Sequence, residues 1–344
     1  METKQRSKLK REWLALGISL VLLAGILLLL TALLTPKRHN YGSTWGHYLA
    51  EPEQSVDALV LGSSLAYCDV VPAEFWRETG LSAYVMAGGE QTLSMSYYYL
   101  KECLKTQSPQ VVFVEITGLF YPRYTSFTKI NVGMMPWGRA RLEATFQEAE
   151  PELRAGLLFP LVFYHDRWKE LTRDDFRYAL GGYGPDLKAG YTYLNQYRPA
   201  GDFYTRNVKP DWENIERNYE FLEKIWELCR QRGITPVFYV TPVVARMPAE
   251  EMDALKARLA ELEGAFVVDF NEEDRFDAIG LDRAVDFYDD LHLNLVGAVK
   301  FTAALADKRQ ARRDDAAGTR DRGRRGRDRS GREGRPRGGR RDIA

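Results

Sequence analysis

A chain of 344 residues with 45% hydrophobic and 12% aromatic side chains can bury a sizeable core, which excludes a protein that is unfolded throughout. Its 48 Lys and Arg residues balance its 48 Asp and Glu residues, so the formal net charge is zero. Residues 308–344, however, hold fifteen Lys or Arg and six Asp or Glu, so the chain ends in a basic tail. Because this tail is rich in Arg and Gly and has almost no apolar side chains, it is predicted to be disordered.

The first predicted element is an apolar helix near the N-terminus. Residues 13–34 carry no charge over about 22 positions, enough for a helix to cross a hydrocarbon layer of about 30 Å. A signal peptide is the competing interpretation, but its apolar region is usually shorter, about 7–15 residues. Residues 1–12 are basic, so the positive-inside rule predicts a cytoplasmic N-terminus. We therefore expect a single-pass cell-membrane protein with its main domain outside the cytoplasm.

Short apolar segments alternate with helical patterns after a predicted linker at 35–55. This alternation predicts an α/β domain over 56–307, in which about five parallel strands form a doubly wound sheet. The predicted strands are 58–61, 83–87, 111–114, 236–240 and 265–268. The predicted helices include 92–105, 215–232 and 249–262.

The alternation breaks between the two halves of this domain. Residues 120–211 contain many aromatic residues and glycines and no clean strand, which indicates an insertion. Within it, His165 and Arg167 are candidates for a substrate pocket, although a structural role in tying the insertion to the core is favoured. Nucleic-acid binding by the Arg/Gly-rich tail is not expected on the outer side of a membrane.

Ser64 is the first residue that suggests chemistry. It follows the first predicted strand in Gly62-Ser63-Ser64, at the carboxyl end of a parallel sheet, where such folds place their reacting groups. A serine in this turn exposes its hydroxyl and leaves its own backbone N–H free to donate. By itself the pattern is far more typical of a serine turn that caps the next helix.

A base with an orienting carboxylate is predicted near the end of the domain. Asp289 and His292 are three residues apart, a spacing that lets an aspartate hold one imidazole nitrogen while the other nitrogen faces a serine. Asp290 is a second candidate for the orienting carboxylate. The four histidines of the chain are too scattered to suggest a metal cluster, and neither a metal nor another cofactor is expected.

These two segments resemble the first and last motif blocks of the SGNH/GDSL hydrolase family. The resemblance covers roughly 56–304 and is strongest for the membrane-anchored type, which includes D-alanyl-lipoteichoic-acid transfer proteins and envelope polysaccharide O-acetyltransferases. It implies a flavodoxin-like three-layer α/β/α fold and a Ser-His-Asp triad of Ser64, His292 and Asp289. It also implies an oxyanion hole formed by the N–H groups of Ser64 and Gly88.

The chain departs from the family pattern in two blocks. Ser63 stands where the first block usually has an aspartate, and Glu115-Ile-Thr117-Gly replaces the block that normally supplies an asparagine donor. Thr117 could replace that donor or line the substrate pocket. Because loss of one oxyanion donor typically costs about 10²–10³ in rate, this departure leaves two functions open.

The first function is a serine acyltransferase or esterase that acts on an acylated cell-envelope polymer, such as a glycan or a teichoic-acid-like polymer. The resemblance implies a polytopic membrane protein as the partner that supplies the acyl group. The second function is a non-catalytic envelope-binding or assembly subunit that has retained the fold.

Overall fold

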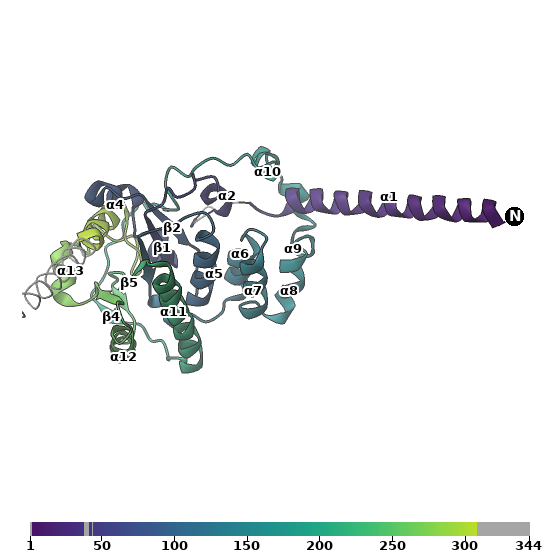
Figure 1. Ribbon diagram of the computed structural model, residues 1–344. Coiled ribbons are helices and arrows are strands. Elements are labelled where there is room, and N and C mark those ends of the chain that lie inside the picture. Colours follow the sequence, from purple (N-terminus) through teal and green to yellow (C-terminus); the bar gives the residue numbers. More distant parts are fainter. Residues whose placement is uncertain (1, 38–40, 43, 308–344) are drawn as a thin grey trace, which may run out of the picture.

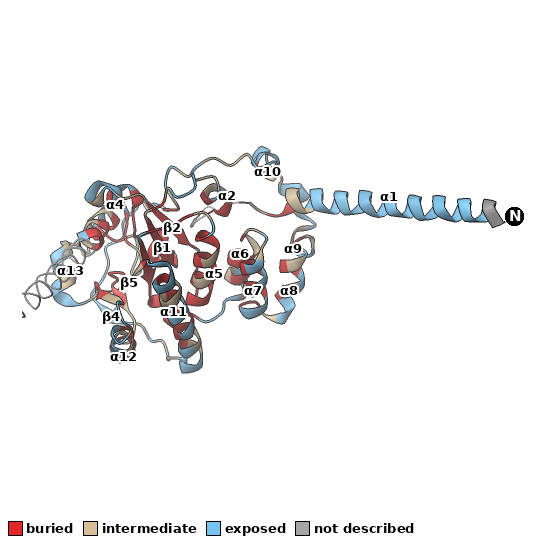
Figure 2. Ribbon diagram, viewed as in Figure 1, coloured by how far each residue is buried: buried red, intermediate tan, exposed pale blue. Residues whose placement is uncertain are grey.

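The computed structural model describes residues 2–37, 41–42 and 44–307. Helix α1 (Glu2–Leu34) extends from the rest of the chain as a long, exposed rod (Figures 1 and 2). Its segment from Gln5 to Leu34 is long and apolar enough to cross a membrane, and a signal sequence would share these properties. The tail at 308–344, for which disorder is predicted, lies outside the described residues.

Five parallel strands form the central sheet, as predicted, in the order β2-β1-β3-β5-β7. From β1 the chain moves outward to β2 and then returns to β3 on the other side of β1, so the direction of winding reverses between β1 and β3. The carboxyl ends of strands at such a reversal are the usual ligand site of an open α/β sheet. The strands are β1 (Ala58–Gly62), β2 (Ala83–Ala87), β3 (Val111–Glu115), β5 (Thr235–Val240) and β7 (Phe266–Asp269).

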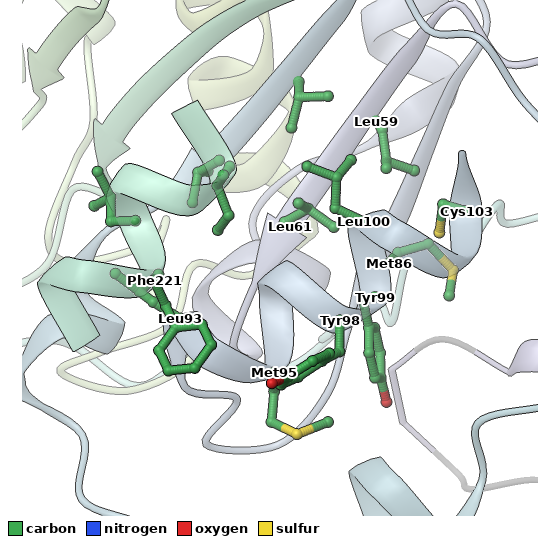
Figure 3. Close-up of a cluster of buried hydrophobic side chains, with 14 of the residues drawn as sticks. Leu59, Leu61, Met86, Leu93, Met95, Tyr98, Tyr99, Leu100, Cys103 and Phe221 are labelled. Carbon is green, nitrogen blue, oxygen red and sulfur yellow. The ribbon is translucent and has the colours of Figure 1, made fainter. Parts of the chain in front are cut away.

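Alternate residues of each strand face two different layers of helices. Leu59 and Leu61 of β1 belong to a core cluster with Leu100 and Phe221 (Figure 3), whereas Ala58 and Val60 belong to a second cluster on the opposite face. The fold therefore has the three α/β/α layers predicted for it. The first face is covered by α5 (Leu93–Cys103), α11 (Trp212–Arg232) and α12 (Ala249–Ala260). The second is covered by α3 (Ser64–Tyr67), α4 (Pro72–Thr79), α13 (Glu273–Ile279) and a helix at 295–307.

The segment 120–211, predicted as an insertion without a clean strand, carries its helices before Leu180, whereas residues 180–211 contain no helix. Helices α6 to α9 lie between α5 and the end of α1 (Figure 1). The helices from the end of β3 onward are η1 (Thr117–Phe120), α6 (Thr125–Gly133), α7 (Arg139–Gln147), α8 (Pro151–Leu158), α9 (Leu161–Tyr164), η2 (Arg167–Glu170) and α10 (Arg173–Ala179).

A small second sheet was not anticipated, and a short helix lies in the segment expected to be a linker or a leading helix. Strand β4 (Tyr204–Thr205) pairs with β6 (Ala245–Arg246) in a two-stranded parallel sheet, and segments of two residues are too short to show any hydrophobic periodicity. Helix α2 (Trp45–Tyr48) lies in the segment expected to be a linker, but Trp45 and Tyr48 are buried in the main core. Their aromatic side chains fix this segment to the domain.

Candidate active site at the carboxyl end of the sheet

Ser64 begins α3 directly after β1, where the sequence places it. Ser63 is the N-cap of this helix, and its hydroxyl accepts a hydrogen bond from the backbone N–H of Leu65 at 3.3 Å. As the first residue of α3, Ser64 has a backbone N–H without an intrahelical acceptor. The turn is tight, because a Cβ at Gly62 would lie 2.7 Å from Cβ of Glu115. Gly62 therefore allows β1 and β3 to approach closely beneath the serine.

His292 lies between Ser64 and Asp289. Its Nε2 is 2.8 Å from Oγ of Ser64, and its Nδ1 is 3.0 and 3.1 Å from the two carboxylate oxygens of Asp289. An ionised carboxylate can only accept hydrogen bonds, so Nδ1 carries the hydrogen and Nε2 is left to accept from the serine hydroxyl. The three side chains thus form a continuous hydrogen-bonded chain.

Asp289 is held as a carboxylate by its own loop. The backbone N–H groups of Leu291 and His292 donate to Oδ1 of Asp289 at 2.9 and 2.8 Å. Partial burial works to raise the pKa of Asp289, but the hydrogen bond to His292, its charge and these two N–H groups outweigh burial and lower that pKa. The carboxylate therefore stays ionised at neutral pH.

Asp290 does not take the orienting position. Its carboxylate accepts a hydrogen bond from the hydroxyl of Tyr204 at 3.0 Å, and its carbonyl oxygen accepts from the backbone N–H groups of Val244 and Ala245. Asp290 therefore connects the loop that carries His292 to the small β4-β6 sheet. Of the two predicted candidates, Asp289 is the one that contacts the imidazole.

The buried carboxyl of Asp69 also holds the loop that carries His292. Its Oδ1 accepts a hydrogen bond at 2.9 Å from the backbone N–H of Leu293, the residue after His292. Asp69 is fully buried, and among the described residues its Oδ2 has no hydrogen-bond partner. Burial raises the pKa of Asp69 well above its usual range, so the neutral acid is favoured.

Glu115 ends β3, where the family pattern has its asparagine. Its Oε1 accepts a hydrogen bond from the backbone N–H of Thr117 at 2.9 Å, while its Oε2 has no partner among the described residues. Burial raises the pKa of Glu115 to about 7, and the hydrogen bonds from Thr117 limit that rise. The Cβ of Glu115 lies next to Gly62, so this side chain packs against the turn that precedes Ser64.

Gly88 directly follows β2, the strand next to β1. Gly62 and Ala87 are paired at the carboxyl ends of these strands, which brings Gly88 to the same edge of the sheet as Ser64. Asn131 of α6 fixes the turn, because its Nδ2 donates to the carbonyl oxygen of Gly89 at 3.0 Å. A Cβ at Gly88 would lie 2.3 Å from Oδ1 of Asn131, so a larger residue does not fit without movement.

A cavity of about 190 Å³ lies beside these residues. Leu65 and Leu291, the sequence neighbours of Ser64 and His292, form part of its lining together with Thr117 and Arg206. Burial raises the pKa of Glu90, and the charges of Arg206 and His292 limit that rise. Of the residues proposed from sequence for a substrate pocket, Thr117 lines this cavity.

His165 and Arg167 lie elsewhere, beside the end of α1. His165 is exposed, and Nδ1 of its imidazole is 3.2 Å from the carbonyl oxygen of Leu161 in its own helix. Arg167 donates to the carbonyl oxygen of Leu34 at 3.2 Å and forms an ion pair of 2.6 Å with Asp175. Arg167 thus ties the insertion to the C-terminal end of α1.

Several residues of the site were not identified from the sequence. Asp69, Glu90, Asn131 and Arg206 reach it from four different segments, and none of them lies in a motif that marks it. Among the described residues, no group of three or more His, Cys, Asp or Glu side chains could hold a metal ion.

In comparisons with known proteins, no protein-family model and no curated protein matches this chain.

Proposed function

We propose that this chain is a membrane-anchored serine acyltransferase or esterase of the SGNH type that acts on an acylated cell-envelope polymer. The observation that carries the proposal is the connected series of contacts from Ser64 through His292 to Asp289. A hydroxyl, an imidazole and a carboxylate in this order are the elements that activate a serine for attack on a carbonyl.

The reaction begins when Oγ of Ser64 attacks the acyl carbonyl carbon and its proton passes to Nε2 of His292. The imidazolium is stabilised by Asp289, and the oxyanion is held by the backbone N–H groups of Ser64 and Gly88. Collapse breaks the bond to the leaving group, which receives the proton from His292, and leaves an acyl-serine ester. An acceptor hydroxyl or water, deprotonated by His292, then attacks this ester; the acylated product leaves, and His292 returns the proton to Oγ of Ser64.

The anchor supports a substrate in the cell envelope. Residues 1–12 are basic and α1 is uncharged from Trp13 to Leu34, so we propose that the N-terminus is cytoplasmic and the domain extracytoplasmic. The bond from Arg167 to the last turn of α1 favours an anchor that is part of the folded protein over a signal sequence that is removed. A tethered enzyme meets a membrane-delivered acyl group at high effective concentration, which suits a polytopic membrane protein as the acyl donor.

A non-catalytic envelope-binding subunit is the second candidate. It is favoured by Glu115, which stands in place of the family's asparagine and offers no amide donor to an oxyanion. Among the described residues near the site, the amide of Asn131 is already used by the carbonyl oxygen of Gly89.

An experiment in cells separates the two candidates. A strain lacking this chain is complemented with the wild type, Ser64→Ala or Ser126→Ala, and base-labile acyl groups on isolated envelope polymers are measured. Ser126 is an exposed serine outside the site and provides the matched control. Catalysis predicts that only Ser64→Ala loses acyl transfer or alters acyl content while remaining at wild-type abundance. Full function of Ser64→Ala would instead support the binding subunit.

A further inference from the structure

A second cavity, of about 380 Å³, lies at the junction between α1 and the helical insertion. Its volume falls within the range of about 300–1,000 Å³ that is usual for small-ligand sites. Leu28, Thr31 and Ala32 of α1 contribute to its lining, so it opens beside the apolar helix itself. The rest of the lining comes from residues after α1, from α2 and from the insertion. The polar and aromatic members are Thr35, Lys37, Trp45, Trp137, Arg141 and Tyr183.

Arg141 is held rigidly in this lining. The guanidinium donates to the carbonyl oxygens of Met135 and Leu157 at 2.7 and 3.0 Å, and its carbon lies 3.9 Å from the centre of the Trp137 ring. Although the side chain is only 4% exposed, its Nε has no hydrogen-bond partner among the described residues. The hydroxyl of Thr35, in a residue that is 9% exposed, also has none. Buried polar groups of this kind usually have a partner, so both can bond to a ligand in the cavity.

The charge of the cavity indicates the chemistry of that ligand. Lys37 and Arg141 line it, and none of the described lining residues is Asp or Glu. The nearby Arg167 is already paired with Asp175. Burial, followed by the charges of Arg141 and Arg167, lowers the pKa of Lys37 against the opposing charge of Asp175, and burial lowers that of Arg141 to about 10. Two cations in a partly buried site, with no carboxylate among its described lining residues, favour an anion.

The surroundings of the cavity indicate a lipid as the source of the anion. Trp137 is 56% exposed at its rim, and the exposed apolar side chains of Phe159, Val162 and Trp168 are grouped around α9, which contacts α1. Exposed aromatic and apolar groups beside a membrane helix are typical of the headgroup region of a bilayer. Between Leu28 and Leu34 a helix rises about 9 Å, which places the cavity across the boundary between acyl chains and headgroups.

We propose that this cavity binds the phosphate of an anionic phospholipid headgroup, with Lys37, Arg141 and Thr35 as its donors. The inference requires that α1 remains as a membrane span, but it does not depend on the chemistry at Ser64. A headgroup bound here would fix the angle of the domain relative to the membrane, since the cavity joins α1 to the insertion.

Native mass spectrometry of the full chain in detergent tests this site. Equal amounts of phosphatidylglycerol and phosphatidylcholine are titrated into the wild type, Lys37→Gln and Lys169→Gln. Lys169 is exposed at the same end of the molecule but does not line the cavity, so its variant controls for loss of one positive charge. We expect the wild type and Lys169→Gln to retain one phosphatidylglycerol preferentially. Lys37→Gln should lose about tenfold in affinity, the usual effect of one charged hydrogen bond.

Arg141→Lys, which keeps the charge but not the fixed fork, should also weaken retention, provided that its thermal unfolding matches the wild type. Equal retention of the two lipids, or equal loss in Lys37→Gln and Lys169→Gln, would overturn the proposal. Displacement of the bound lipid by millimolar inorganic phosphate would also overturn it, because a site for a free anion does not require the lipid.

Discussion

Oγ of Ser64 lies 2.8 Å from Nε2 of His292, although the two residues are 228 positions apart in the sequence. The contact exists because β1 ends at Gly62, two residues before Ser64, and the loop carrying His292 is fixed to the same edge of the sheet by Asp69 and by the β4-β6 sheet. Buried groups therefore hold these two distant segments at a fixed position relative to each other. The reactivity of Ser64 should depend on those groups as well as on His292.

The adjacent carboxylates Asp289 and Asp290 should have separable roles. Asp289→Asn should lower the rate of serine labelling or acyl transfer by about 10³–10⁴, because an amide cannot hold the imidazole in the required tautomer. Asp290→Asn keeps an acceptor for the hydroxyl of Tyr204 and should stay within about threefold of the wild type. Rates of labelling by a fluorophosphonate, measured for both variants side by side, check this; equal losses would exclude Asp289 as the orienting residue.

Asp69 should act as a neutral hydrogen-bond acceptor. Asp69→Asn retains the oxygen that accepts from the N–H of Leu293, so we expect near-normal reactivity. Asp69→Ala leaves that buried N–H without a partner, which typically costs about 1–3 kcal/mol of stability, and should slow labelling of Ser64 at least tenfold. Thermal unfolding and labelling rates distinguish the two variants. If Asn were as damaging as Ala, the ionised carboxylate would be the required form.

Glu115 should make the folded state less stable as the pH rises. Its folded pKa of about 7 lies above its usual value, because ionising the buried carboxyl destabilises the folded state. This destabilisation is absent below about pH 4, grows as the pH rises, and is nearly complete above about pH 7. Between pH 5 and pH 8 the change should amount to roughly 2–3 kcal/mol. Glu115→Gln removes the titration, so the stability of the variant relative to the wild type should increase by that amount between pH 5 and pH 8. Denaturant unfolding at both pH values measures it; a constant difference would contradict the raised pKa.

Gly88 should not tolerate a side chain. In Gly88→Ala, the new Cβ would meet Oδ1 of Asn131, whose amide holds the carbonyl oxygen of Gly89, so the turn must move. Displacement of one oxyanion donor should reduce the reaction rate by about 10²–10³. Gly184→Ala is the matched control, because a Cβ at Gly184 meets no atom within 4 Å. Esterase or transferase rates of the two folded variants should differ accordingly, and comparable rates would argue against Gly88 as a donor.

All five strands of the central sheet were predictable from the sequence within about two residues at each end. Each is a short apolar run bounded by Gly, Pro or polar residues, and burial on both faces of the sheet makes such runs conspicuous. Ser64, Asp289 and His292 could be proposed because strand ends and a three-residue spacing are visible in the sequence.

The supporting residues could not be proposed in this way. Asp69 is recognisable only through its contact with Leu293, and Asn131 only through its contact with Gly89. Both contacts depend on how distant segments pack. The helices of the insertion were also not resolved from the sequence, because their faces pack against α5 and α1 as well as each other and therefore show no simple apolar stripe.

The central claim is that Ser64 is an activated nucleophile, and intact-mass analysis of the full chain after fluorophosphonate treatment tests it most directly. We expect one adduct on the wild type and on the control Ser126→Ala, and none on Ser64→Ala or His292→Ala. An adduct that persists in Ser64→Ala, or a folded wild-type protein that takes up no reagent, would contradict a catalytic role for this site.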